Sequence, residues 1–285
     1  MQRKEPTVSA QDIGEVEIPY LLYENAGPCI LMLHATGFQP WQWHPIAKKL
    51  SEKYRIIAPY FCTHREPDQV QRSISWLNLA EDLAILCEKL QVENPILVGH
   101  SMGATLATIG TAKFGIRPER MVLIEPIYLP QEFYQAGIGV EEHPLASKSI
   151  KRRNFWKDET EAETYLRSKK MFQQWDEEAI RLYIHYGMTR TKDSCLQLDC
   201  PPENEAGLFV GGGEFDPWPL LPAISCPVLV IEGGTSENRL FIDLKKAAAS
   251  FPNGEYVEIR NAGHLIPMEK PTEIYETISA FLKAQ

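Results

Sequence analysis

The sequence predicts an α/β fold, in which helices flank a mostly parallel sheet and a helical insertion interrupts the chain. Three observations predict it. Short apolar runs rich in β-branched residues alternate with segments of helical period. The strand rhythm stops over residues 128–222, which begin and end near clusters of proline. A Gly-x-Ser-x-Gly motif stands between one predicted strand and the helix that follows it.

Mainly apolar runs are predicted to form the central strands of the sheet. They cover residues 29–33, 54–58, 95–98, 121–124 and 228–231. Such runs are typical of parallel strands that are buried on both faces. Segment 15–23 mixes polar and apolar positions and is predicted as an antiparallel edge strand, whereas 255–259 is predicted as the last strand.

Helices are predicted where apolar residues recur every three or four positions. In the core these are residues 75–90, with Ser75 as a possible cap, 102–114 and 271–282. The insertion has helical sequence at 159–172 and 177–186. We therefore predict one core, formed by residues 1–127 and 223–285, which is interrupted by a helical cap at 128–222.

The charge of the chain argues against two classes of partner. The formal net charge is −9 and the isoelectric point lies near 5.4, so the surface as a whole repels nucleic acid and anionic membranes. Hydrophobic residues make up 44% and charged residues 24% of the chain, which are ordinary globular values. We predict a folded protein that binds a small molecule, and the sequence leaves its oligomeric state open.

The cysteines and the first residues indicate a reduced, cytoplasmic protein. The six cysteines form no Cys-x-x-Cys pair, and we interpret them as packing residues that bind no metal. Residues 1–13 are polar, unlike a signal peptide, and no run of about 18 apolar residues occurs.

The motif Gly99-His100-Ser101-Met102-Gly103 lies between a predicted strand and a predicted helix. This context makes the motif specific, because the tight turn holds the serine hydroxyl exposed above the sheet. The Met102 N–H lies at a helix N-terminus, where it can stabilise an oxyanion. Ser101 is therefore the candidate nucleophile.

Two further segments supply candidate partners for Ser101. The strand at 29–33 leads into His34-Ala35-Thr36-Gly37, a small loop whose Thr36 N–H is the second candidate oxyanion donor. His264 follows the last predicted strand and is the candidate general base, since a neutral imidazole can accept the serine proton.

Together these segments resemble the α/β-hydrolase superfamily, in particular its serine members with a helical cap. The resemblance covers about residues 15–285, and Ala35 departs from the His-Gly pair that is usual in the oxyanion loop. It implies an eight-stranded, mostly parallel sheet, a Ser-His-acid triad and no cofactor. The serine disfavours the dehalogenases and epoxide hydrolases of the superfamily, which use aspartate.

The acid of the triad has two candidates. The usual family position, after the strand at 228–231, holds Ser236, and Glu237 follows it. A second family arrangement places the acid after the preceding strand, where Glu125 stands. We rank Glu237 first, because its glycine-containing loop is flexible enough to carry a glutamate to the imidazole.

The resemblance implies hydrolysis of a carboxylic ester through an acyl-enzyme. Hydrolysis of a carbon–carbon bond or of a lactone uses the same residues and remains an alternative. A protein that binds a small molecule without turnover is a further alternative.

Overall fold

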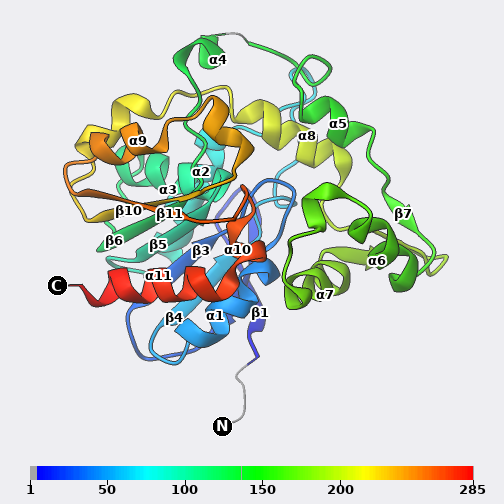
Figure 1. Cartoon of the computed structure of the whole chain (residues 1–285), viewed down its shortest axis with the longest axis horizontal. Helices are drawn as coiled ribbons and strands as arrows, with labels where there is room; N and C mark the ends of the chain where they lie inside the picture. Colours follow the sequence, from blue (N-terminus) through cyan, green and yellow to red (C-terminus); the bar gives the residue numbers. More distant parts are fainter. Residues whose placement is uncertain (1–4, 136, 285) are drawn as a thin grey trace.

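The computed structural model describes residues 5–135 and 137–284. Residues 1–4, which begin the predicted core and the polar stretch 1–13, lie outside the described residues. The core is a sheet between two layers of helices, and the segment between its sixth and seventh strands folds beside it (Figure 1). In the described ranges, no helix is long and apolar enough to cross a membrane.

The sheet has eight strands in the order β1-β2-β4-β3-β5-β6-β10-β11. Strands β4, β3, β5, β6, β10 and β11 are parallel, while β1 and β2 are antiparallel to their neighbours. This confirms the predicted fold class. The strands are β1 (Thr7–Asp12), β2 (Glu17–Tyr23), β3 (Cys29–Leu33), β4 (Arg55–Pro59), β5 (Ile96–His100), β6 (Arg120–Ile124), β10 (Val228–Gly233) and β11 (Gly254–Ile259).

One strand prediction needs correction. Segment 15–23 contains β2, which is antiparallel as predicted, but β2 is not the edge, because β1 pairs with its outer side. No residue of β1 is fully buried, so the strand has no apolar face that would mark it in the sequence.

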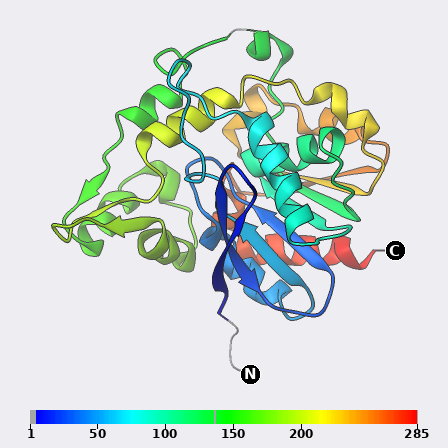
Figure 2. The same cartoon turned by 180° about the vertical axis from the view of Figure 1, so that it is seen from behind.

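Alternate residues of the central strands face opposite helical layers. On one face, Leu31 and Leu97 pack with α2 (Trp76–Lys89), α3 (Met102–Lys113) and α9 (Leu244–Ser250). On the other, Ile30 and Val98 pack with α1 (His44–Leu50) and α11 (Pro271–Lys283). Figure 1 shows α11 in front of the sheet, and Figure 2, from behind, shows α2 in front.

The segment between β6 and β10, residues 125–227, is called the insertion below. It contains a three-stranded sheet in the order β7-β9-β8, which the sequence analysis did not predict. The predicted boundaries at 128 and 222 remain a prediction. The elements of the insertion are α4 (Gln131–Gln135), α5 (Ala146–Ile150), β7 (Phe155–Trp156), α6 (Glu159–Arg167), η2 (Lys170–Phe172), α7 (Glu177–Tyr186), β8 (Met188–Arg190), β9 (Leu196–Leu198), α8 (Pro202–Gly211) and η3 (Trp218–Ala223).

The helix predicted at 159–172 is shorter in the structure. It ends at Arg167, and Lys169 has an extended backbone before the single turn η2. Trp175 and Tyr183 of the insertion pack in one buried cluster with Phe38 and Leu265, which lie in loops that follow core strands. The backbone N–H of Asp176, the N-cap of α7, donates to the Met268 carbonyl at 2.8 Å. The insertion is thus tied to the ends of the strands.

Candidate active site

Ser101 lies in the tight turn between β5 and α3. Its backbone has φ 54° and ψ −118°, a conformation that is rare for a residue with a side chain and marks a strained turn. A Cβ on Gly99 would overlap the backbone of Ala104, and one on Gly103 would overlap the carbonyl of Leu33. Both glycines of the motif are therefore required by the close approach of strand and helix.

A chain of hydrogen bonds joins Ser101, His264 and Glu125. The Ser101 Oγ lies 3.0 Å from His264 Nε2, and His264 Nδ1 lies 2.9 Å from Glu125 Oε2. An ionised carboxylate only accepts, so Nδ1 carries the hydrogen and Nε2 presents its lone pair to the serine hydroxyl. His264 comes from the loop after β11, while Ser101 and Glu125 follow the adjacent strands β5 and β6.

Glu125 is buried, and donors surround its carboxylate. Its side chain is 1% exposed. The Gly233 N–H donates to Oε1 at 2.7 Å, and the Ser236 hydroxyl donates to Oε2 at 2.8 Å. A buried carboxyl group without such partners would be strongly unfavourable, and these bonds together with the imidazole N–H give its oxygens hydrogen-bond partners. Its φ of 49° turns the chain sharply just after β6.

The structure places Glu125, and not the first-ranked Glu237, beside His264. The Glu237 side chain is 82% exposed and lies 3.0 Å from Lys170 of the insertion, whose hydrogen bond lowers the pKa of that carboxyl. The reason is the direction of the loop: Ser236 turns inward to Glu125, so the next residue turns outward. The feature of the sequence that favours Glu125 is its place at the end of a buried strand, beside the strand that leads to Ser101.

One candidate oxyanion donor lies at the start of α3, directly after Ser101. The other lies in the loop after β3. Met102 is the first residue of α3, and Thr36 is buried in the loop. Neither backbone N–H donates to an acceptor in the part of the chain that the structure describes. Gly37 has φ 76°, and a Cβ there would overlap the Glu205 side chain of the insertion. The loop therefore needs glycine at 37 but not at 35.

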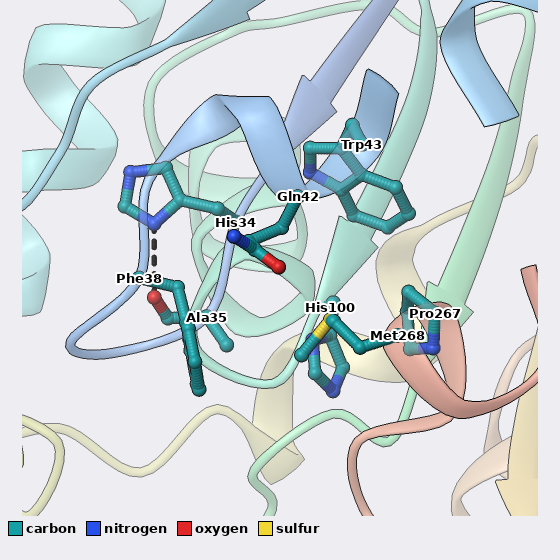
Figure 3. A pocket seen from close by; sticks show the side chains of 8 residues that line it. All are labelled: His34, Ala35, Phe38, Gln42, Trp43, His100, Pro267 and Met268. Carbon is teal, nitrogen blue, oxygen red and sulfur yellow. Dashed lines mark hydrogen bonds between the residues drawn. The ribbon is translucent and has the colours of Figure 1, made fainter. Parts of the chain in front are cut away.

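Two histidines that sequence reasoning left without a role hold these loops. The Phe61 N–H donates to His34 Nε2 at 2.9 Å, so the hydrogen is on Nδ1 and is donated to the Ala35 carbonyl, also at 2.9 Å (Figure 3). His100 Nε2 donates to the His264 carbonyl at 2.8 Å. Burial, and then the charge of His264, lowers the pKa of His100 to about 3, so His100 stays neutral.

A small cavity lies behind these loops (Figure 3). Its volume is about 10 Å³, close to the least that one water molecule requires. The buried amide of Gln42 has no hydrogen-bond partner among the described residues. The cavity is lined by His34, Ala35, Phe38, Gln42, Trp43, His100, Pro267 and Met268.

Relatives and solved structures agree with this arrangement of the fold. The chain is 24% identical over 275 residues to 2-(acetamidomethylene)succinate hydrolase of Mesorhizobium japonicum, which covers 96% of this chain and 94% of that protein. A crystal structure of E-2-(acetamidomethylene)succinate hydrolase superposes with a TM-score of 0.81 at 22% identity, over 98% of this chain and 100% of that one.

A thermophilic esterase from Thermogutta terrifontis superposes with a TM-score of 0.70 at 23% identity, over 99% of this chain and 98% of that one. At such identities the likeness establishes the fold alone. A model of the alpha/beta hydrolase family matches residues 30–277, which is most of the chain. The chain therefore belongs to the alpha/beta hydrolase family.

Proposed function

We propose that this hydrolase cleaves a carboxylic ester through an acyl-enzyme, with Ser101 as nucleophile, His264 as general base and Glu125 as the acid. The observation that carries the proposal is the continuous chain from Ser101 Oγ to His264 Nε2 at 3.0 Å and from Nδ1 to Glu125 Oε2 at 2.9 Å. In such a triad each member holds the next in the orientation that proton transfer requires.

In the first step, Ser101 Oγ attacks the carbonyl carbon of the ester while His264 Nε2 takes the hydroxyl proton. The carbonyl oxygen becomes an oxyanion, which accepts hydrogen bonds from the Thr36 and Met102 N–H groups. Glu125 stabilises the imidazolium through Nδ1. When the carbon–oxygen bond breaks, Nε2 returns the proton to the leaving alcohol, and the acyl group stays on Ser101.

In the second step, water replaces the alcohol. His264 Nε2 takes a proton from the water, whose oxygen attacks the acyl carbon, and the same two N–H groups hold the oxyanion again. The tetrahedral intermediate then breaks down, which releases a carboxylic acid, and His264 returns the proton to Ser101. These steps balance with water as the only co-reactant and require no cofactor. We extend the proposal to a small acyl substrate in the cytoplasm, on the grounds of composition and charge.

The same residues support lactone opening and carbon–carbon bond hydrolysis. Structural neighbours of this chain include an enol-lactonase from Burkholderia xenovorans, with a TM-score of 0.69 at 19% identity. A panel of p-nitrophenyl acyl esters, lactones and diketones separates the three reactions. We expect the highest kcat/KM on an ester. A higher value on one of the other classes would transfer the proposal to that reaction.

The nucleophile is tested by covalent labelling. A fluorophosphonate should add one phosphonyl group to the protein, and peptide mass spectrometry should place it on Ser101. Ser101→Ala should lose the label and nearly all ester turnover, on the order of a millionfold in kcat. Ser250→Ala, at a half-buried serine that ends α9, is the matched control and should keep both. A Ser101→Ala variant with a tenth of the original turnover would refute the assignment.

A further inference from the structure

We propose that Asn238 is a positioning residue of His264, whose side-chain carbonyl oxygen accepts the Nδ1 hydrogen together with Glu125. The inference rests on the proposed function and adds a fourth residue to that site. Asn238 lies in the single turn η4 (Glu237–Leu240), directly after the exposed Glu237. The atom of its amide that stands 3.0 Å from His264 Nδ1 is placed as the nitrogen Nδ2.

The Nδ1 atom has two neighbours with conflicting demands. Glu125 Oε2, at 2.9 Å, accepts and requires a hydrogen on Nδ1, whereas an amide NH₂ group at 3.0 Å would require a lone pair there. The Gly233 N–H and the Ser236 hydroxyl keep Glu125 an acceptor. The hydrogen is therefore on Nδ1.

It follows that the Asn238 amide presents its oxygen to the imidazole. The oxygen and nitrogen of an amide have nearly the same shape, and their placement is decided by the hydrogen bonds that they make. With Oδ1 toward Nδ1, both neighbours accept the same hydrogen, and both stabilise the imidazolium when Nε2 takes the serine proton. With NH₂ in that place, the hydrogen would move to Nε2, and His264 would cease to be a base for Ser101.

The backbone around Asn238 fixes the side chain in this place. The Asn238 carbonyl accepts from the N–H groups of Phe241 at 3.0 Å and Ile242 at 2.8 Å. Two residues earlier, the Ser236 hydroxyl donates to Glu125 at 2.8 Å. One short loop therefore contacts both the acid and the imidazole. The loop after β10, where the family usually carries the acid, thus keeps a role in the site although the proposed acid follows β6.

A consequence is that position 238 can hold a second acid. Aspartate has the shape of asparagine, so Asn238→Asp places a carboxylate oxygen about where the amide stands, 3.0 Å from Nδ1. In Glu125→Gln the usual acid is lost, and kcat should fall by about 10⁴. Adding Asn238→Asp should restore at least a hundredfold of that loss. Asn78→Asp, at an exposed position of α2, is the matched control and should restore nothing.

The single variants give a test that does not depend on the folding of Glu125→Gln. Asn238→Asp adds negative charge beside Nδ1 and stabilises the imidazolium, so the acidic limb of the profile of kcat/KM against pH should move up by about one pH unit. Asn238→Leu removes an acceptor, so kcat should fall several-fold and the limb should move down. Neither shift is expected of a residue that only packs the loop.

The proposal is overturned if Asn238→Leu raises kcat. That result is expected if the NH₂ group of Asn238 faces Nδ1 and competes with Glu125, because the variant removes the competitor. It is also overturned if Asn238→Asp leaves the pH profile unchanged and restores no more activity to Glu125→Gln than Asn78→Asp does. These failures differ from a failure of the proposed function. If the proposed function fails, the unmodified protein lacks ester turnover or fluorophosphonate labelling at Ser101. If only the role of Asn238 fails, the unmodified protein keeps both.

Discussion

His100 donates its Nε2 hydrogen to the backbone carbonyl of His264, 2.8 Å away. The residue before Ser101 therefore holds the loop that carries the imidazole of His264. His100 is 2% exposed, and burial, followed by the charge of His264, lowers its pKa from 6.5 to about 3. It therefore stays a neutral donor near neutral pH.

We expect His100 to make the protein less stable in acid. Between about pH 6.5 and pH 3, the unfolded chain binds a proton at this residue that the folded chain does not bind. The contribution of His100 to the free energy of unfolding should therefore be constant above pH 6.5. Below that pH it should fall by about 1.4 kcal/mol per pH unit. Urea unfolding at pH 7, 6 and 5 measures this slope.

His100→Gln keeps an N–H donor but cannot titrate, so its slope over this range should be smaller by about one proton. His185→Gln, at an exposed histidine of α7, should keep the original slope. Equal slopes for His100→Gln and the unmodified protein would show that this histidine does not govern acid stability.

The parts of the fold that the sequence predicted are those with local signals. Apolar runs mark the central strands, because parallel strands are buried on both faces. Strand β1 has no buried residue, and the strands of the small sheet have two or three residues each, too few for a period to show. Their pairing depends on contacts between distant segments, which periodicity does not report.

The candidate site divides in the same way. Ser101, Met102, Thr36 and His264 stand in motifs, and the structure brings Ser101 and His264 within 3.0 Å of each other. The choice between the two glutamates depends mainly on which way two loops turn their side chains. Glu125 and Glu237 both follow a strand, but Glu125 is buried against His264 while Glu237 points outward to Lys170. Asn238 has no signal at all in a single sequence.

The acid assignment predicts opposite results for two glutamates. Glu125→Gln should lower kcat by about 10⁴, because the variant removes the negative charge that stabilises the imidazolium of His264. Glu237→Gln should stay within about twofold, since its ion pair with Lys170 is exposed and such pairs contribute little. Steady-state kinetics on one p-nitrophenyl ester tests both. Loss of turnover in Glu237→Gln alone would return the role to that residue.

The insertion should control which acyl chain is accepted. Trp175 is buried and packs on Phe38, with ring centroids 5.6 Å apart, so it supports the loop that carries Thr36. Trp175→Leu removes bulk there and should shift the preference toward longer acyl chains. The measurement is kcat/KM over a series of p-nitrophenyl esters. Phe155→Ala, at a ring that is 57% exposed, is the control and should keep the profile.

An unchanged profile in Trp175→Leu, with circular dichroism like that of the unmodified protein, would place the acyl pocket elsewhere in the molecule. A loss of folding would be visible in the same spectrum. Trp175→Phe then provides a milder change, for which the same direction of shift is expected.

The last prediction concerns Gly37 in the oxyanion loop. Its φ is 76°, and a Cβ there would overlap the Glu205 side chain, which is paired with Arg152. Gly37→Ala should therefore displace the loop and with it the Thr36 N–H. Loss of one oxyanion donor lowers kcat by about 10² to 10³, so a partial displacement should lower kcat by roughly tenfold to a hundredfold with little change in KM. Gly115→Ala is the matched control, because Gly115 has the same φ of 76° but nothing within 4 Å of the added Cβ. Both variants carry the backbone strain of a positive φ, on the order of 1 kcal/mol or more, and both should melt earlier. Only Gly37→Ala should lose turnover. Equal kcat in the two variants would show that the contact between Glu205 and the loop does not hold the oxyanion donor in place.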